Sequence, residues 1–216
     1  MTFKTFRIYL RNQIGRIMNI INNKITFFLF VWLTTASVLA QTPYYLKSDK
    51  VTVSGTSTLH DWVSEVTKVE WSGNLLLEDN KIKEVSGVKV RIPVKSIKSE
   101  KGRIMDSKTY EAFDSDKNPF IIYTLSAAKV SGSTTDFTIN STGTLSMAGT
   151  SRTIEMPVKA KVFGNGDVQL KGSYKMNLRD FKMEPPTAIM GTIKVGEELT
   201  IDFDLTISTT KMTAIK

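Results

Sequence analysis

The chain of 216 residues contains no cysteine and a single histidine, His60. The absence of cysteine excludes disulfides, a thiol nucleophile, a thiolate metal site and a lipid anchor on an N-terminal cysteine. One imidazole is too few for an HExxH metal site, and the sequence contains neither a P-loop nor a GxSxG nucleophile elbow. We therefore expect no metal site, no cofactor and no catalytic residues. A hydrolase that pairs His60 with Ser57 and Asp61 stays open as a minor alternative, because these residues lie too close in sequence for a persuasive triad.

Acidic residues are missing from the first forty positions, which carry five basic residues. An almost unbroken apolar run occupies residues 25–39, and its length of about 15 residues falls short of the roughly 20 that a transmembrane helix needs. Val38 and Ala40 are small, as signal peptidase requires. The sequence thus predicts a signal peptide at residues 1–40, cleaved before Gln41. We expect the mature protein to be periplasmic or secreted, without stable membrane insertion.

A large excess of positive charge is absent once the predicted leader is removed. The formal net charge of +8 falls to +3 without the five basic residues of the leader, since 24 basic and 21 acidic residues remain. This balance gives no support to a basic patch for nucleic acid. The remaining 176 residues, 41–216, are enough for one domain with a core of its own.

Apolar and polar residues alternate with a period of two along the rest of the chain. In IDFDLTIS (201–208) the apolar residues occupy every second position, which is typical of a strand with one buried face. Residues 88–94, 154–162 and 168–178 repeat the pattern. We therefore predict that residues 41–216 form an all-β, antiparallel domain of about eight or nine strands.

Turn signals separate the predicted strands. They are Gly73-Asn74, Asp79-Asn80, Gly132-Ser133, Gly149-Thr150-Ser151 and the run at 164–167. Pro93 and Pro157 fall inside strand patterns, where each removes a donor from the hydrogen-bond ladder. Both prolines are therefore expected at a strand edge or a bulge.

One stretch, RIMDSKTYEAFDSDKNP (103–119), breaks the period of two. Met105, Ala112 and Phe113 recur there at positions i, i+7 and i+8, which is the spacing of one helical face. The stretch predicts one short helix that ends near Asn118-Pro119.

An antiparallel meander of this length hides its edges either in a sandwich or in a closed barrel. Alternation alone does not say which face of the strands is inside. An outer-membrane barrel would place the apolar face outward between aromatic girdles. Aromatic residues make up only 9% of this chain and form no evident girdle, while the polar faces are dense in lysine, aspartate and glutamate. We therefore favour a soluble barrel with an apolar interior.

Four segments together resemble the YceI-like family of exported bacterial proteins over about residues 45–209. They are GTSTLHDW (55–62), IPVKSIKSEKGRIMDSKTYEAFDSDKNPFIIYTLSA (92–127), GTLSMAGTSRTIEMPV (143–158) and LRDFKMEPPTAIMGTIKVGEELTIDFDLTI (178–207). The Asp180-Phe181 pair followed by Pro185-Pro186 is the most specific element. The resemblance implies a lipocalin-like barrel that holds a lipid, such as an isoprenoid, a fatty acid derivative or another long-chain amphiphile, as a carrier, store or stress protein.

One departure from the family pattern limits what the resemblance implies for this chain. Many members carry a histidine shortly after the aspartate of the helix, whereas Asp106 is followed here by Ser107 and Lys108. A metal-binding role that rests on that imidazole is therefore not expected in this chain.

The expected ligand contacts come from the lining and the mouth of the barrel. They are His60, Trp62, Ile92, Met105, Tyr110, Phe113, Leu145, Met147, Met156, Tyr174, Met176 and Met190. Several are methionines, whose flexible thioethers suit a wall that adapts to a mobile tail, although ordinary core packing explains them equally well. The helix at Ile104–Phe113 or the segment at Ala188–Gly191 is expected to gate the mouth.

The role of His60 depends on the conformation of GTSTLHDW. If this stretch is extended, Thr58, His60 and Trp62 share one face, so His60 follows Trp62 to one end of the barrel. There it contacts either a ligand head group or a backbone carbonyl, as a structural histidine does.

A structural or interaction module with a packed interior and no lipid is the main alternative. Gly143, Gly172 and Ser141 lie on the inward register and leave room, which favours a cavity. A homodimer formed through an edge strand is also possible on physical grounds.

Overall fold

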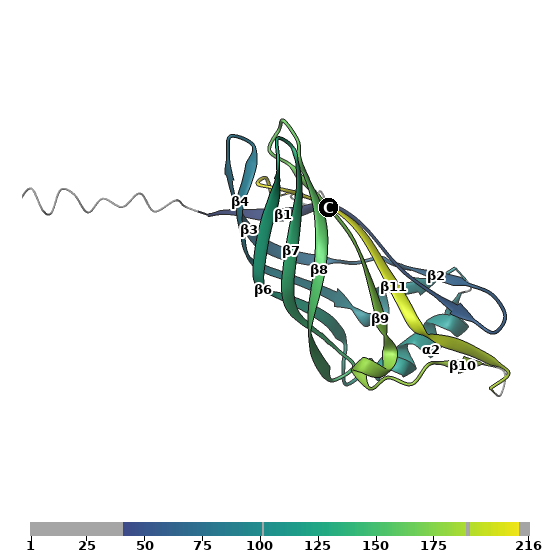
Figure 1. Ribbon diagram of the computed structural model, residues 1–216. Helices are drawn as coiled ribbons and strands as arrows, with labels where there is room; N and C mark the ends of the chain where they lie inside the picture. The colour runs from purple at the N-terminus through teal and green to yellow at the C-terminus, as the bar shows by residue number, and fades with distance from the viewer. Residues whose placement is uncertain (1–40, 101, 189–190, 212–216) are drawn as a thin grey trace, which may run out of the picture. The chain divides into compact units, whose positions relative to one another are not determined.

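The computed structural model describes residues 41–100, 102–188 and 191–211 (Figure 1). The predicted signal peptide, residues 1–40, lies outside the described residues. The strands are β1 (Thr42–Ser57), β2 (Trp62–Val66), β3 (Glu70–Glu78), β4 (Lys81–Pro93), β5 (Ile97–Ser99), β6 (Phe120–Ser133), β7 (Asp136–Met147), β8 (Thr150–Val162), β9 (Val168–Asn177), β10 (Thr187–Ala188) and β11 (Ile193–Ser208). The helices are α2 (Arg103–Phe113) and the 3₁₀ turns η1 (Val94–Ser96) and η2 (Leu178–Phe181).

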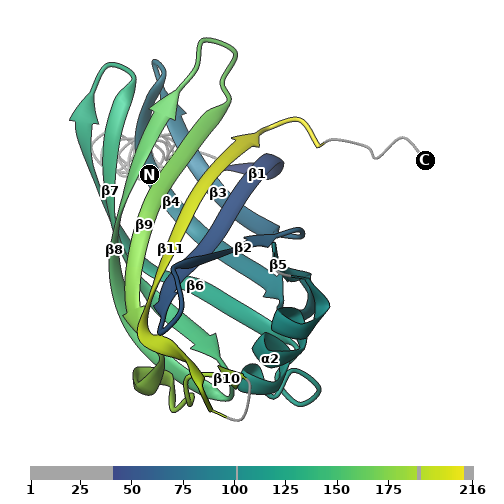
Figure 2. The same cartoon turned by 90° about the vertical axis from the view of Figure 1, so that its right-hand side faces the viewer.

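Eight of the strands in the described residues form a closed antiparallel ring. Their order is β1, β3, β4, β6, β7, β8, β9 and β11, and the ring closes because β11 pairs with β1. Figure 2 shows these two strands side by side across the front of the barrel. β2 and β5 extend the sheet from β1, and β10 extends it from β11. The predicted antiparallel barrel of about eight strands with one short helix is confirmed, and the sandwich is excluded.

The strand alternation places the apolar side chains inside the barrel. On β8, Ile154, Val158 and Ala160 are buried, whereas Glu155 and Lys159 between them are exposed. Burying one face of each strand removes apolar surface from water and leaves charged groups solvated. The interior of the barrel is therefore its apolar side, as predicted.

Two of the strand connections are two-residue turns in which both residues have a positive φ. Asp79 and Asn80 have φ angles of 50° and 57° between β3 and β4, and Ala148 and Gly149 have 47° and 72° between β7 and β8. Such turns match the right-handed twist of a hairpin. The predicted turn at Gly73-Asn74 is wrong, because these residues lie inside β3.

A bulge explains the wrong turn at Gly73. The register between β3 and β4 shifts between Ser72 and Asn74. A Cβ at Gly73 would come within 2.9 Å of the ring of Trp71 and of Val88. Gly73 therefore serves a close approach inside a strand, which is the other common use of a glycine in a strand pattern.

Both strand prolines occupy positions where no ladder donor is needed. Pro93 is the last residue of β4 and pairs with Phe120. Pro157 lies just before the segment Val158–Val162 over which β8 pairs with β9. The expectation of strand edges at the two prolines is confirmed, and β8 parts from β9 at Pro157.

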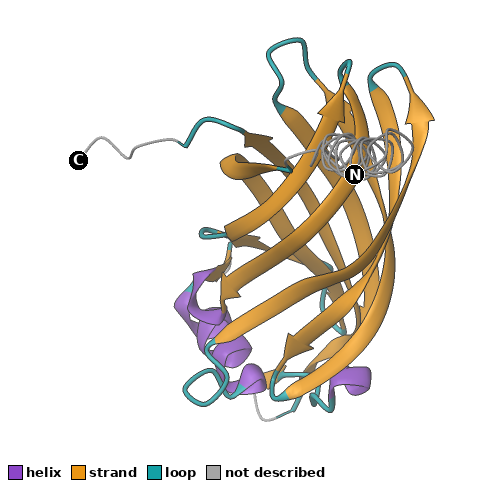
Figure 3. Ribbon diagram, turned by 90° about the vertical axis from the view of Figure 1, so that its left-hand side faces the viewer, coloured by secondary structure: helices purple, strands orange, loops and turns teal. Residues whose placement is uncertain are grey.

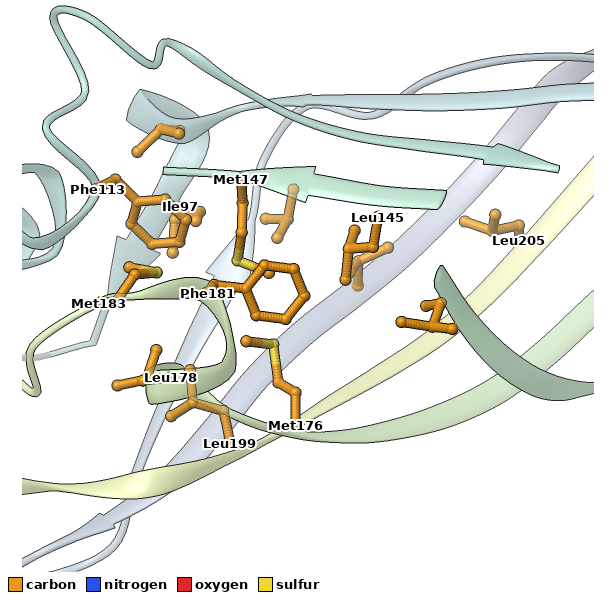
Figure 4. Close-up of a cluster of buried hydrophobic side chains, with 14 residues drawn as sticks. Ile97, Phe113, Leu145, Met147, Met176, Leu178, Phe181, Met183, Leu199 and Leu205 are labelled. Atoms are coloured by element: carbon orange, nitrogen blue, oxygen red, sulfur yellow. The ribbon is translucent and has the colours of Figure 1, made fainter. Parts of the chain in front are cut away.

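Two buried apolar clusters occupy the two ends of the interior. The far-end cluster is Tyr44, Leu75, Ile82, Phe137, Ile139, Val158, Ala160, Val162, Val168 and Ile207. The helix-end cluster includes Ile97, Phe113, Met147, Met176, Leu178, Phe181 and Met183 and is drawn in Figure 4. Figure 3 shows that the helices gather at one end of the barrel, so that end is covered by helices and turns rather than by strands.

Candidate functional site

The barrel interior contains an apolar cavity in two chambers. The inner chamber has a volume of about 160 Å³ and the outer chamber about 290 Å³. Ile121 on β6 and Ile201 on β11 line both chambers, so the two are neighbours. All eight ring strands contribute to the inner chamber, which lies between the two ends of the barrel.

The lining of the inner chamber is uncharged. Its lining side chains with polar groups are Tyr123, Ser141 and Tyr174, which carry hydroxyls, and Trp71, which carries an indole N–H; the other lining side chains are apolar. Burial raises the pKa of Tyr123 and of Tyr174, and Asp180 adds to the rise at Tyr174. The chamber therefore offers no counter-charge to an ionised group.

The outer chamber is lined by α2, by the hairpin between β1 and β2, and by residues that follow η2. It carries more polar groups, among them His60, Ser64, Lys108 and Thr109. Leu59 also lines this chamber although its side chain is 66% exposed. The outer chamber therefore reaches solvent beside the hairpin, and we call this opening the mouth.

The stretch GTSTLHDW forms the β1–β2 hairpin, with Gly55 paired to Trp62. The Ser57 amide donates to the carbonyl of His60 at 3.1 Å, and the Ser57 hydroxyl donates to the same carbonyl at 2.7 Å. The stretch is therefore not extended throughout, because Ser57 closes a turn before β2 begins at Trp62. Trp62 and His60 both line the outer chamber.

The His60 ring is engaged with its own backbone. Its Nδ1 atom lies 2.8 Å from the carbonyl oxygen of Asp61. The nearby Ser57 hydroxyl contacts the His60 carbonyl rather than the ring. This geometry does not provide the serine–imidazole contact that a hydrolytic triad requires. Ligand contact by His60 stays a prediction.

Helix α2 forms one wall of the outer chamber. Met105, Ala112 and Phe113, the residues of its predicted apolar face, all line the chamber. Asp106 is buried, and its Oδ1 atom accepts a hydrogen bond of 2.7 Å from the amide of Ser99. This contact ties the helix to β5. Asp106 therefore has a structural role in this chain.

Tyr110 lies outside the lining of both chambers. Its hydroxyl is 3.0 Å from the carbonyl oxygen of Lys95 and 3.1 Å from that of Ile97, and it accepts a hydrogen bond of 2.6 Å from Lys98. The side chain therefore fastens α2 to η1 and β5. The structure thus gives Tyr110 a fastening role and does not place it in the cavity lining, where the sequence predicted it.

The other predicted contacts divide between the chambers. Ile92, Leu145, Met156 and Tyr174 line the inner chamber, and His60, Trp62, Met105, Phe113, Met147 and Met176 line the outer chamber. Met190 lies outside the described residues. The structure thus brings ten of the predicted residues to the walls of two neighbouring chambers, and their contact with a ligand stays a prediction.

Sequence reasoning missed the large aromatic side chains of the inner chamber, Trp71, Tyr123 and Phe203. Alternation in FIIYTLSA, which places Ile121, Tyr123 and Leu125 on one face, was a usable signal for Tyr123.

The expectation that Gly143 and Gly172 leave room in the barrel interior is wrong. The Tyr123 ring covers Gly143 and the Phe203 ring covers Gly172, so the neighbouring strand fills the room that each glycine leaves. Ser141, the third small residue, does line the inner chamber.

Phe181 was also missed as a packing residue. It is 1% exposed and lies between Met147 and Met176 in Figure 4. Thioether sulfur packs favourably against aromatic rings. The preceding residue is held from β8, where Arg152 Nε donates to the carbonyl of Asp180 at 2.7 Å. The Asp180-Phe181 pair therefore anchors η2 over the end of the barrel.

Charged groups of the described residues lie outside the inner chamber. The Lys47 ammonium is 2.6 Å from Asp167, and this hydrogen bond lowers the pKa of Asp167 despite the opposing effect of burial. In the described part of the chain, no cluster of three or more His, Asp or Glu side chains is placed to hold a metal ion. The described helices are all too short or too polar to cross a bilayer.

Comparison with known proteins identifies the family of this chain and structures that share its fold. The sequence profile of a family described as YceI-like domain matches residues 44–207. BcnA from Burkholderia cenocepacia is 18% identical, with a TM-score of 0.58 over 73% of this chain and 95% of that chain. Curated proteins gave no match.

Two further solved structures share the fold. A polyisoprenoid binding domain from Saccharophagus degradans, implicated in plant cell wall breakdown, is 12% identical with a TM-score of 0.58, covering 78% of this chain and 98% of that one. A YceI protein from Campylobacter jejuni is 17% identical with a TM-score of 0.54, covering 69% and 85%.

Proposed function

This chain belongs to the YceI-like domain family, and we propose that it is an exported lipid-binding protein. Its barrel would hold an isoprenoid or another long-chain amphiphile, shielding the tail from water without catalysing a reaction. The observation that carries the proposal is the uncharged inner chamber of about 160 Å³ at the centre of a closed barrel. The structurally similar domain from Saccharophagus degradans is described as polyisoprenoid binding, which supports the same class of ligand.

The energetics favour a long apolar tail. Each methylene group transferred from water is worth about 0.8 kcal/mol, so ten such groups give a gross gain of about 8 kcal/mol before the costs of association. The inner chamber offers apolar contact on all sides, and its methionine Met156 adapts to irregular shapes. Affinity is therefore expected to follow tail length, with tolerance among tails of similar girth.

The outer chamber suits the transit of an amphiphile between solvent and the inner chamber. His60, Lys108 and Thr109 stand at or near the mouth, where a polar group retains partial contact with water. We propose that α2 gates this mouth, because one face of the helix forms part of the chamber wall. Delivery and storage of the lipid are both compatible with such a gate.

Export to the periplasm or the medium is part of the proposal. It rests on the basic and apolar pattern of residues 1–40, and its direct test is the N-terminal sequence of the protein recovered from its host. A mature N-terminus at Gln41 supports export. An intact leader on cytosolic protein contradicts it.

Native mass spectrometry of protein purified from its own host tests lipid binding directly. We expect a bound species whose mass matches a long-chain lipid, and a rise in melting temperature when a prenyl compound is added to stripped protein. An empty interior combined with no thermal shift would favour the alternative, a structural or interaction module. The open inner chamber argues against the packed interior that this alternative assumes.

The suggested homodimer stays a prediction. Closure of the ring leaves β5 and β10 at the ends of the strand order in the described residues, with three and two residues respectively. Such short edges offer few ladder hydrogen bonds to a partner chain. Light scattering of the purified protein measures its mass in solution and so distinguishes a monomer from a homodimer.

A further inference from the structure

The inner chamber contains a buried polar atom, the phenol oxygen of Tyr123, that lacks a hydrogen-bond partner. Among the described residues, the phenol oxygen of Tyr123 is the buried side-chain nitrogen or oxygen that has no hydrogen-bond partner. Buried donors without a partner are rare in native proteins and costly, because the group has given up its bonds to water. The phenol of Tyr123 therefore offers a hydrogen bond that no group of the described residues accepts.

The position of this phenol is fixed by packing. The ring of Tyr123 lies against Gly143 on the neighbouring strand, so close that a Cβ there would be 2.5 Å from the ring. A glycine at this place lets the ring lie flat along the sheet, and the ring cannot swing away without leaving Gly143 uncovered. The hydroxyl is consequently held within the chamber.

The side chain of Ser141 lies close enough to Tyr123 to lower its pKa, yet no hydrogen bond of ordinary geometry joins the two hydroxyls. Ser141 donates its hydroxyl proton to the carbonyl of Met156 at 2.8 Å. Burial raises the pKa of Tyr123, and the nearby Ser141 hydroxyl offsets that rise only in part. The phenol thus stays protonated at neutral pH and offers one O–H donor.

The lining of the chamber restricts what can accept this hydrogen bond. An ionised carboxylate or phosphate in the inner chamber would be buried without a counter-charge, which is strongly unfavourable. A neutral acceptor oxygen carries no such penalty. A ketone or quinone carbonyl and an alcohol all meet this requirement.

We propose that the inner chamber recognises a neutral, oxygen-bearing group of the lipid through a hydrogen bond donated by Tyr123. This inference rests on the proposed lipid-binding function and adds a specificity determinant to it. It places an uncharged carbonyl or hydroxyl oxygen of the lipid deep in the barrel. An ionised group is confined to the mouth, beside Lys108.

The expected size of the effect follows from the strength of a neutral hydrogen bond. Such a bond contributes a factor of about five to binding, with a range of about three- to tenfold, because desolvation of the ligand oxygen offsets part of the gain. Tail burial therefore still dominates affinity, and the hydrogen bond decides between tails of equal length.

Two matched ligands test the proposal on the full mature chain. One is a linear isoprenoid methyl ketone and the other is the hydrocarbon in which a methylene replaces the carbonyl oxygen. Dissociation constants are measured by competition in native mass spectrometry for the wild-type protein and for Tyr123→Phe. We expect the wild type to prefer the ketone by about fivefold, and Tyr123→Phe to lose that preference while it binds the hydrocarbon unchanged.

Two control variants test whether the ketone oxygen of the ligand contacts Tyr123 or another side chain of the two chambers. Tyr174→Phe removes the other tyrosine hydroxyl of the inner chamber, and His60→Ala removes the imidazole at the mouth. Both are expected to keep the preference for the ketone. Loss of the preference in either control, together with its survival in Tyr123→Phe, would overturn the assignment to Tyr123.

The remaining outcomes separate this inference from the proposed function. Equal binding of both ligands by the wild type leaves lipid binding intact and overturns the role of Tyr123. Failure of both ligands to bind overturns the proposed function and the inference with it. Tyr123→Phe keeps the ring over Gly143, so it should melt at the same temperature as the wild type or higher. A lower melting temperature without ligand would show that the hydroxyl is satisfied within the protein, which also contradicts the proposal.

Discussion

The ring of Tyr123 on β6 covers the backbone of Gly143 on β7. A Cβ at Gly143 would lie 2.5 Å from the Tyr123 Cζ atom and 2.6 Å from the carbonyl oxygen of Thr124. The backbone oxygen cannot move aside without disturbing the sheet. We therefore expect Gly143→Ala to lower the free energy of unfolding by about 1–3 kcal/mol. Urea denaturation monitored by tryptophan fluorescence measures the change.

Gly164→Ala is the matched control for Gly143→Ala. Gly164 lies in the turn between β8 and β9, and an added Cβ meets no atom within 4 Å. Its effect should stay within about 0.5 kcal/mol. Equal losses in the two variants would show that the packing of Tyr123 on Gly143 is not what makes the glycine necessary.

Enlarging a residue of the inner chamber should shorten the longest tail that binds. Met156 is half-buried and faces the chamber, so the indole of Met156→Trp is expected to occupy part of the space of about 160 Å³. Affinity for a twenty-carbon isoprenoid should fall at least about tenfold, since the loss of two buried methylenes already costs about 1.6 kcal/mol. A ten-carbon analogue should bind nearly as before. Isothermal titration measures both ligands.

Glu155→Trp places the same side chain one residue away on the outer face of β8, where Glu155 is exposed. It should leave the binding of both ligands unchanged. A parallel loss of long-tail binding in the two variants would contradict a ligand inside the barrel.

The packing of Phe181 between two methionines predicts a large loss of stability on truncation. Phe181→Ala should cost about 3–5 kcal/mol, because it removes a ring that is 1% exposed and leaves a void between Met147 and Met176. Phe163, which is 38% exposed, provides the comparison, and Phe163→Ala should cost much less. Thermal melts followed by circular dichroism distinguish the two. A small effect at Phe181 would mean that η2 is not anchored by this ring.

The ion pair between Lys47 and Asp167 predicts a specific pH dependence. The hydrogen bond from Lys47 lowers the pKa of Asp167 in the folded state, so the contribution of Asp167 to stability is complete above the unfolded pKa of about 4. It is lost as the pH falls through the lower folded value. At pH 7, Asp167→Asn should lower the free energy of unfolding by about 1–3 kcal/mol.

Urea denaturation from pH 7 down to pH 2 checks this dependence. The difference between wild type and Asp167→Asn should shrink below about pH 4, where the wild-type carboxylate also becomes protonated. Asp202→Asn, on an exposed position of β11, is the control and should show little change at any pH. A difference that persists unchanged at pH 2 would assign the effect of Asp167→Asn to lost packing rather than to charge.

Sequence reasoning reached the fold because the relevant signals are local. Alternation in segments such as IDFDLTIS determines which side of a strand is apolar, and Asp79-Asn80 supplies residues that tolerate a positive φ. The spacing of Met105, Ala112 and Phe113 placed the face of α2 correctly. These patterns need no knowledge of distant residues.

The shape of the cavity depends on contacts between strands, which alternation does not encode. The sequence suggests open space beside Gly143, but the strand register places the ring of Tyr123 there. The ring of Phe203 occupies the space beside Gly172 in the same way. The conformation of the GTSTLHDW stretch also depends on such a contact, because the Ser57 hydroxyl closes a turn by donating to the carbonyl of His60. The face of each residue was therefore predictable, whereas the volume that it leaves was not.

The barrel is closed by its first and last ring strands, so its interior forms only at a late step of folding. β1 and β11 are paired from Tyr45 with Ser208 to Ser57 with Val195, so the ring stays incomplete until the end of the chain is available. Contacts between residues so far apart in sequence form slowly and expose apolar surface in the meantime. The folding chain is therefore most prone to aggregation just before its final strand docks, and the barrel interior cannot enclose any molecule until that step is complete.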